Sequence, residues 1–384
     1  MNGRMRIGAL AMLVVLVVVV LVVPAASAKG PAKGPRSLKV WVGQQLAFDT
    51  DLSEPDGQAC SSCHFPTAGY ADPDQDLPVS EGVITGMFGG RNAPPWAYAA
   101  FSPPFHAEVG DEGETLYVGG QFWDGRAVDL VAQAKGPFLN PVEMHNPGKW
   151  AVVRDAGDSI YAAAFERLYG KGSFKLENAE RTYDNIADAI AAYESMRAVS
   201  PFTSKYDAYL AGHATLTPQE AQGLELFNGK ANCDACHPSG TGETPVEGRP
   251  VFTDFTYDNL GVPTNPAYFL PPLSFNMAGY QPDLGLGVTT GDPLQKGKFK
   301  VSSLRNIALT APYGHNGYFK TLKDIVHFYN TRDVPEAMWP APEVPENVNE
   351  DELGNLGLTG EEEDAIVAFM ETLTDKWIQP VTVP

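Results

Sequence analysis

Two five-residue stretches, Cys60-Ser61-Ser62-Cys63-His64 and Cys233-Asp234-Ala235-Cys236-His237, decide how this chain folds. Both have the pattern C-x-x-C-H, and together they contain all four cysteines of the 384 residues. In this spacing two thiols on one turn can reach the two vinyl groups of a haem, and the next residue can bind its iron. The sequence therefore predicts two covalently bound c-type haems, attached through Cys60, Cys63, Cys233 and Cys236, with His64 and His237 as proximal iron ligands.

The same cysteines could serve other purposes. A Cys₄ zinc site would use both C-x-x-C pairs, although it would not need a histidine after each pair. A redox dithiol would need one pair, not two. Exported chains also use cysteines in disulfides. Because every cysteine belongs to the same five-residue pattern, we expect haem attachment, with zinc or disulfides as the alternatives.

The start of the chain has the features of an export signal. Arg4 and Arg6 precede an unbroken apolar run, 8–23, and an A-x-A cleavage site follows at 26–28. We expect residues 1–28 to be removed and the mature protein to lie in the periplasm of a Gram-negative bacterium. Because the apolar run is nearly long enough to span a bilayer, retention as a membrane anchor is the alternative.

The composition limits both the fold and the partners. The chain is 43% hydrophobic and 19% charged, with 38 glycines and 32 prolines, which excludes a coiled coil and favours a globular protein rich in loops. The formal net charge is −20 and basic residues are not clustered, so nucleic acid is not an expected partner. A protein with a neutral or basic face fits this surface better.

Helical patterns precede each C-x-x-C-H stretch. We predict helices at residues 38–48 and 217–227 before the two stretches, and others at 159–169, 183–196, 322–329 and 361–374. The regions 65–120 and 238–300 are rich in Gly, Pro and Asp and are predicted as loops, with short strands near 251–255. The expected fold is mainly α, with two cytochrome-c-like domains at 29–205 and 206–384.

Four further segments resemble the bacterial di-haem cytochrome c peroxidase family, which includes the MauG branch. They are RNAP at 91–94, FWDGRA at 122–127, NPVEM at 140–144, and LRN continuing to TAPYGHNG at 304–317. They occur in the family's order, and the resemblance covers essentially the whole mature chain. It implies a peroxide-reactive haem in the N-terminal domain and an electron-transfer haem in the C-terminal domain, both near the domain interface.

The resemblance also implies how the first haem reacts. In family members that are activated by reduction, a distal histidine in the loop before RNAP blocks the iron. The stretch 78–91 contains no histidine, and Met87 is better explained as a packed loop residue, so this haem is expected to be open. Glu143 is implied as the catalytic base and acid for peroxide, and Gln133 as its hydrogen-bonding partner. A solvated loop acid is the alternative for Glu143.

Two further roles rest on the resemblance alone. Trp123 is implied as an electron relay between the haems, and the alternative is a core aromatic residue. Three residues match positions through which the family binds a calcium ion between its domains, and oxygen donors of this kind suit Ca²⁺. These residues are Asn92, Thr310 and Pro312.

The second haem departs from the usual family pattern. An iron-binding methionine normally follows the histidine of the PYxHxG motif by 14 residues, and from His315 that position is Tyr329. A tyrosine oxygen stabilises oxidised iron, whereas methionine raises the potential. The alternatives for this ligand are His327, which points to another side of the helix, and Met338 in the following loop.

The expected activity is that of a periplasmic enzyme that uses hydrogen peroxide at the His64 haem. The missing distal histidine and Tyr329 favour MauG-like oxidation of a tryptophan or tyrosine on a partner protein. The alternative is a detoxifying cytochrome c peroxidase with a small cytochrome or cupredoxin as donor. A non-catalytic di-haem carrier is a third class, and the FWDGRA and NPVEM segments count against it.

Overall fold

The computed structural model describes residues 37–110, 113–240, 248–273 and 280–378. The predicted signal at 1–28 therefore lies outside the described residues. Helices dominate the secondary structure, as predicted. Their bounds are α1 (Leu38–Ala47), α2 (Cys60–Cys63), α3 (Leu130–Ala134), α4 (Gly136–Leu139), α5 (Lys149–Asp158), α6 (Ala162–Tyr169), α7 (Ala179–Glu194), α8 (Lys205–Leu210), α9 (Pro218–Phe227), α10 (Leu286–Thr290), α11 (Leu322–Thr331) and α12 (Gly360–Glu371).

Two short antiparallel pairs make up the strands. β1 (His106–Val109) pairs with β2 (Thr115–Val118), and β3 (Tyr257–Asp258) pairs with β4 (Phe299–Lys300). The strand expected near 251–255 is wrong, since the ladder begins only at Tyr257. Phe252 and Phe255 have φ values of 55° and 63°, which an extended strand does not allow. The β1–β2 hairpin lies in a region that the sequence predicted as loop.

The first hydrophobic core forms where α1 crosses α7. A Cβ atom on Gly43 would lie 1.8 Å from the carbonyl oxygen of Ala189, so only glycine lets the two backbones approach this closely. Val42 and Leu46 of α1 are fully buried against Ile186 of α7. The helix that precedes the first C-x-x-C-H stretch is thereby fixed to the long helix α7.

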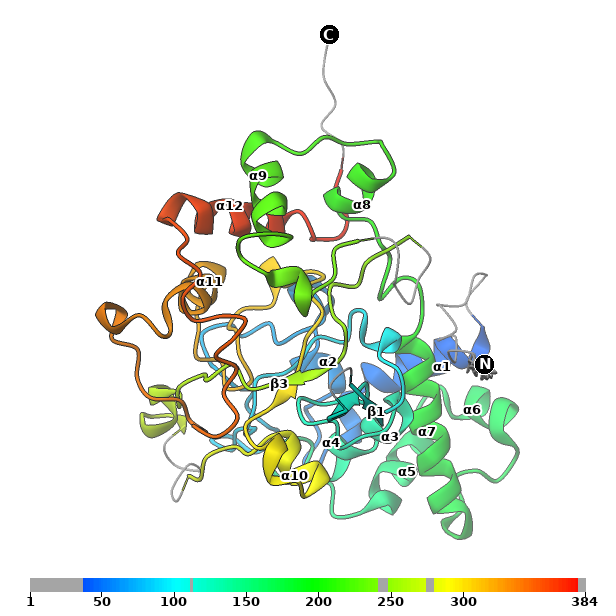
Figure 1. Cartoon of the computed structure of the whole chain (residues 1–384). Helices are drawn as coiled ribbons and strands as arrows, with labels where there is room; N and C mark the ends of the chain where they lie inside the picture. The colour runs from blue at the N-terminus through cyan, green and yellow to red at the C-terminus, as the bar shows by residue number, and fades with distance from the viewer. Residues whose placement is uncertain (1–36, 111–112, 241–247, 274–279, 379–384) are drawn as a thin grey trace, which may run out of the picture.

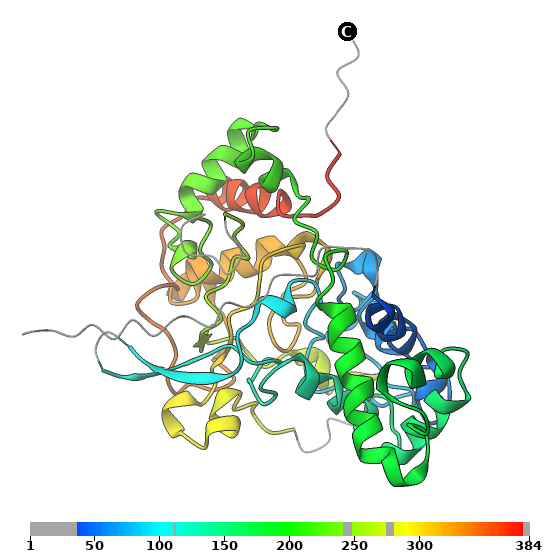
Figure 2. The same ribbon diagram turned by 90° about the vertical axis from the view of Figure 1, so that its right-hand side faces the viewer.

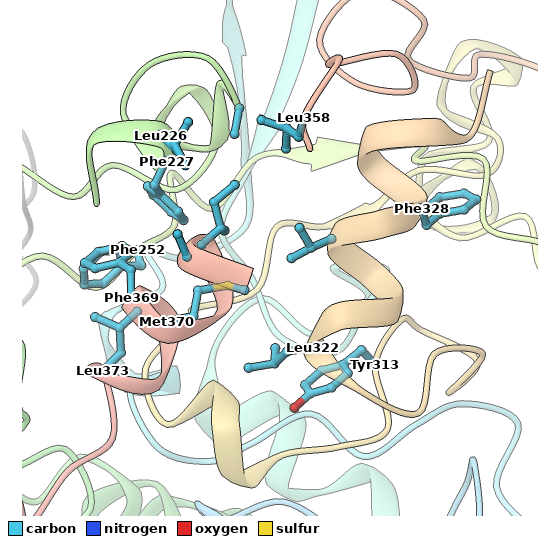
Figure 3. Packing of buried hydrophobic residues seen from close by; sticks show 14 of the residues in the cluster. Leu226, Phe227, Phe252, Tyr313, Leu322, Phe328, Leu358, Phe369, Met370 and Leu373 are labelled. Atoms are coloured by element: carbon cyan, nitrogen blue, oxygen red, sulfur yellow. The ribbon is translucent and has the colours of Figure 1, made fainter. Parts of the chain in front are cut away.

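The second core repeats this arrangement with α9 and α12. Thr217 caps α9 and accepts from the Glu220 amide in a capping box, and Pro218 occupies the first turn, as the sequence predicted. A Cβ atom on Gly223 would lie 1.9 Å from the Ala365 carbonyl oxygen. Figure 3 shows this core, in which side chains of α9 and α12 meet those of α11.

The two cores lie at opposite ends of the molecule. Helices α1, α5, α6 and α7 pack together at one end, and α8, α9, α11 and α12 form the other (Figure 1, Figure 2). The two largest hydrophobic clusters consist of residues within 42–190 and within 206–373. The predicted domain boundary at 205/206 falls between these ranges, and it stays a prediction. Within the described part of the chain, every helix is too short or too polar to cross a membrane.

Candidate functional site

The first C-x-x-C-H stretch lines a cavity of about 490 Å³. Cys60 and Cys63 lie at the two ends of the single turn α2, and His64 follows directly as its C-cap residue. The three side chains face the same cavity, whose volume falls in the range of ligand pockets, about 300–1,000 Å³. The turn thus presents two thiols and one imidazole to one space, which is the arrangement that haem attachment requires.

The imidazole of His64 is held in a defined orientation. Its Nδ1 lies 3.3 Å from the Tyr70 carbonyl oxygen, so Nε2 is the nitrogen that would bind a metal. The Trp96 indole stacks on the ring, with centroids 4.8 Å apart and planes inclined by 16°. Burial lowers the pKa of His64 to about 4, so the ring is neutral, as a metal ligand must be.

The residues implied in peroxide chemistry line the same cavity. Asp129 caps α3 by accepting from the Ala132 amide, and this helix carries Gln133 to the cavity wall. Glu143 lies in the turn that follows α4, where its Oε1 accepts from Asn140 Nδ2 at 2.6 Å. Burial raises the pKa of Glu143, while Asn140 and Arg126 oppose the rise. Its carboxyl is thus a partly buried acid in the wall of the cavity.

The second C-x-x-C-H stretch lines a separate cavity of about 200 Å³. Cys233, Cys236 and His237 contribute to its wall, and His237 Nδ1 lies 2.8 Å from the Phe252 carbonyl oxygen. Burial lowers the pKa of His237 to about 4. Phe252 has a positive φ, so the backbone turns at this residue and the predicted strand does not form there. The carbonyl of the same residue contacts the His237 imidazole.

The structure separates the three candidates for the second iron ligand. Tyr329 on α11 lines the cavity with both cysteines and His237, and burial raises the pKa of its hydroxyl well above the usual value. His327 instead pairs with Glu363 on α12, with Nδ1 and Oε1 2.9 Å apart. Met338 is 85% exposed. Of the three, only Tyr329 is placed for the ligand role, which itself stays a prediction.

The two cavities share part of their walls. Asn92, Pro95, Trp123 and the segment 300–303 line both of them. Trp123 is fixed at both ends, because its Nε1 donates to the Asn92 carbonyl oxygen and its own carbonyl accepts from the Lys300 amide, each at 2.8 Å. An electron relay between the two sites would need a redox-active side chain in this wall, and the Trp123 indole lies there.

The predicted calcium ligands Asn92, Thr310 and Pro312 all line the second cavity. Asn92 Nδ2 donates to the Pro78 carbonyl oxygen at 3.1 Å, and this fixes the side-chain amide. Pro312 follows a cis peptide bond. The three residues are therefore brought to one region, and their role as calcium ligands stays a prediction.

The arrangement of the cysteines counts against the zinc and disulfide alternatives. All four are described, none forms a disulfide, and the two pairs face different cavities. Within the described ranges, no three side chains of His, Cys, Asp or Glu are grouped as a metal site.

Charged residues near the cavities were missed by the sequence reasoning. Arg91 binds Asp283 through two hydrogen bonds of 2.6 and 2.8 Å, and its third nitrogen lies 2.7 Å from Asp124. Lys300 donates to the Gly120 carbonyl oxygen at 2.7 Å, and burial lowers its pKa to about 8. Arg91, Arg126 and Lys300 are the cations in the cavity walls that could bind the carboxylates of a haem.

Two further residues of the first cavity were also missed. Trp96 follows RNAP by two positions, but its sequence gives no sign that it stacks on His64. Glu194 ends α7 and is 1% exposed, and burial raises its pKa to about 8. Among the described residues its Oε2 has no hydrogen-bond partner. A buried carboxyl at the end of a predicted helix carries no distinguishing sequence signal.

Comparisons with known proteins agree with this geometry. Residues 37–215 match the family model of the di-haem cytochrome c peroxidases. The sequence is 40% identical to the methylamine utilization protein MauG of Paracoccus denitrificans, covering 98% of this chain and 97% of that protein. It is 33% identical to the cytochrome c551 peroxidase of Pseudomonas aeruginosa, covering 80% of this chain and 75% of that protein.

A solved structure extends the likeness to the fold. The diheme peroxidase BthA from Burkholderia thailandensis superposes with a TM-score of 0.77 at 33% identity, covering 90% of this chain and 88% of that chain. Sequence and fold thus agree with the two C-x-x-C-H cavities. The chain belongs to the di-haem cytochrome c peroxidase family, which includes MauG, and is a peroxide-dependent oxidoreductase of two c-type haems.

Proposed function

We propose that this protein is a periplasmic enzyme that cleaves hydrogen peroxide at the His64 haem and oxidises a tryptophan or tyrosine side chain on a partner protein. Electrons from that side chain reach the first haem through the second haem and Trp123. The observation that carries the proposal is the position of Tyr329, which lines the cavity of Cys233, Cys236 and His237. A tyrosine oxygen there favours a low-potential iron that is suited to high oxidation states.

The proposal gives the cavity residues defined tasks. A haem held by Cys60, Cys63 and His64 would supply the electrons that break the O–O bond. Glu143 accepts the proton of the near peroxide oxygen and returns it to the far oxygen, which leaves as water. Gln133, on the neighbouring wall, orients the peroxide by hydrogen bonding. Asn140 holds the Glu143 carboxylate by donating to Oε1, so the base keeps one geometry through both proton transfers.

We further propose that Asn92, Thr310 and Pro312 bind one calcium ion. All three line the cavity of the second haem, and Asn92 accepts the hydrogen bond of Trp123 through its backbone carbonyl. An ion held there would stiffen the wall that separates the two haems. Amide and carbonyl oxygens are donors that calcium commonly uses.

The alternative is a peroxidase that detoxifies H₂O₂ with electrons from a small cytochrome or cupredoxin. The relative from Pseudomonas aeruginosa is named a cytochrome c551 peroxidase, and this name favours a small cytochrome as the electron donor in the alternative. A donor of high potential would be poorly matched to a tyrosine-ligated haem. A carrier without catalysis would have no use for Glu143 and Gln133 in the wall of a haem cavity.

The test starts from the fully oxidised protein with no prior reduction. We expect an electron paramagnetic resonance signal of high-spin ferric haem and an optical response of both haems to one equivalent of peroxide. The peroxide-treated protein is then offered reduced cytochrome c, reduced cupredoxin, or an exported Trp-rich protein encoded beside it. Cross-linking or hydroxylation of the last, seen by mass spectrometry, supports the proposal. Two low-spin haems at rest, or steady turnover with the small donors alone, would contradict it.

A further inference from the structure

A small aromatic cluster lies beside His64, at the wall of the first haem cavity. Trp96 and Tyr193 are 6% and 2% exposed, and they belong to one buried hydrophobic cluster that also contacts Cys60. Their ring centroids are 6.3 Å apart with planes at 83°. Neither residue has a task in the peroxide chemistry proposed above.

The position of Trp96 relative to His64 is unusually well defined. The indole and the imidazole are almost parallel, with planes at 16° and centroids 4.8 Å apart, and the indole also lines the haem cavity. The Trp96 amide donates to the carbonyl oxygen of Tyr70 at 3.0 Å, and the same oxygen lies 3.3 Å from His64 Nδ1. One carbonyl therefore contacts both the His64 imidazole and the Trp96 backbone, which helps to fix how the two rings stack.

This placement suits electron transfer, because the stacked indole lies against the imidazole that would bind the haem iron and also lines the haem cavity. Burial keeps an oxidised indole away from water. The Tyr193 ring packs at right angles to the indole, and the electrons of an aromatic ring stabilise nearby positive charge.

We propose that Trp96 is a second one-electron donor to the His64 haem, separate from the Trp123 path, and this rests on the proposed function. After peroxide has oxidised the haem, one electron leaves the indole π system and reduces the haem by one equivalent. The indole keeps its Nε1 proton and becomes a radical cation. The next electron from the external reductant restores it. Trp96 thereby stores one oxidising equivalent next to the haem until a partner protein arrives.

The test compares three variants of the holoprotein after mixing with one equivalent of peroxide and no donor. Trp96→Phe removes the oxidisable ring, Trp96→Tyr keeps one, and Trp339→Phe is a matched control. Trp339 is a partly buried tryptophan that packs on Phe328 and does not line the haem cavities. Freeze-quenched samples are examined by electron paramagnetic resonance, with and without ring-deuterated tryptophan.

We expect a radical signal in the wild type that narrows on deuteration, is lost in Trp96→Phe and persists in Trp339→Phe. Trp96→Tyr should give a tyrosyl-type signal that deuterated tryptophan does not narrow. Trp96→Phe should also lengthen the lifetime of the peroxide-treated haem several-fold. If both haems respond to peroxide while the radical is absent from the wild type, or survives Trp96→Phe, the inference is wrong and the proposed function stands. If the haems do not respond, the proposed function itself fails.

Discussion

The indole Nε1 of Trp123 donates a hydrogen bond to the backbone carbonyl of Asn92, 2.8 Å away. Both residues line both cavities. Two further hydrogen bonds anchor Asn92. Its backbone amide donates to the His315 carbonyl at 2.8 Å, and its side-chain amide donates to the Pro78 carbonyl. The relay and the predicted calcium site therefore share one residue, and a change at either should be felt at the other.

Replacing Trp123 by Phe should uncouple the two haems. The change removes the donor to Asn92 and replaces an oxidisable ring by one that is much harder to oxidise. Peroxide should still alter the spectrum of the first haem at the wild-type rate, while the response of the second haem is delayed or lost. Stopped-flow spectroscopy with one equivalent of peroxide separates the two responses. Synchronous responses of both haems in this variant would exclude Trp123 as the relay.

Removing calcium should loosen the same wall. A chelator such as EGTA is expected to lower the melting temperature of the holoprotein, because a ligand that binds only the folded state stabilises it. Adding Ca²⁺ back should restore the temperature, and Mg²⁺ should not, since it demands a tighter octahedral site. The Asn92→Ala variant should melt at one temperature with or without EGTA. If EGTA leaves the melting temperature of the wild type unchanged, the proposal of a calcium site is wrong.

Glu143→Gln should slow peroxide cleavage by roughly 10²–10⁴-fold, the usual contribution of positioned proton transfer. Glutamine keeps the shape and the hydrogen bond with Asn140 but cannot accept a proton. Glu177→Gln, an exposed carboxylate of the same half of the chain, is the control and should react at the wild-type rate. The measurement is the rate of the optical change on mixing with peroxide. Wild-type speed in Glu143→Gln would assign the proton transfer to another group.

The pH dependence of the same rate follows from the burial of Glu143. Its pKa is raised, and only the ionised form accepts a proton, so the rate should fall as the pH drops through the raised pKa. The midpoint should lie above the value of about 4.3 for a free glutamate. Glu143→Gln should lose this titration and show a flat profile over the same range.

Exchange of Tyr329 for Met tests the ligand of the second haem. Methionine raises the potential of a c-type haem relative to an oxygen ligand, so the variant should accept electrons from a reduced small cytochrome more readily than the wild type. A potentiometric titration checks the shift. His327→Asn is the matched control, because His327 pairs with Glu363 and leaves the cavity to Tyr329. A spectral change of the second haem in the histidine variant would move the ligand role to His327.

The sequence was sufficient where structure depends on neighbours along the chain. The capping box and Pro218 at the start of α9 are local signals, and that helix begins and ends as predicted. Tyr329 was identified through the family resemblance, which implies an iron ligand 14 residues after His315, and the residue lies on α11. Helix α5 was missed, since it has no polar cap and follows Gly148.

Contacts between distant segments could not be predicted in this way. Arg91 and Asp283 are 192 residues apart, and the sequence around each of them does not indicate that they form an ion pair. The stacking of Trp96 on His64 depends on a turn whose Tyr70 carbonyl contacts both residues. The shift of the short strand to Tyr257 follows from the burial of Phe252 in the second core, which only the folded chain reveals.

The crossing of α9 and α12 gives the last prediction, since it holds the second C-x-x-C-H stretch in place. A methyl group on Gly223 would lie 1.9 Å from the Ala365 carbonyl oxygen, so Gly223→Ala must push the helices apart. Overpacking of this kind costs about 1–3 kcal/mol, and denaturant unfolding of the holoprotein measures it.

Gly360→Ala is the control for that variant, because nothing lies within 4 Å of its added methyl and α12 begins there. It should stabilise the fold by about 0.4–1 kcal/mol through the unfolded state. Gly43→Ala should match Gly223→Ala, since its methyl would lie 1.8 Å from the Ala189 carbonyl oxygen. Equal stability of Gly223→Ala and the wild type would mean that the helices can separate freely, and the crossing could not then position the haem-binding turn.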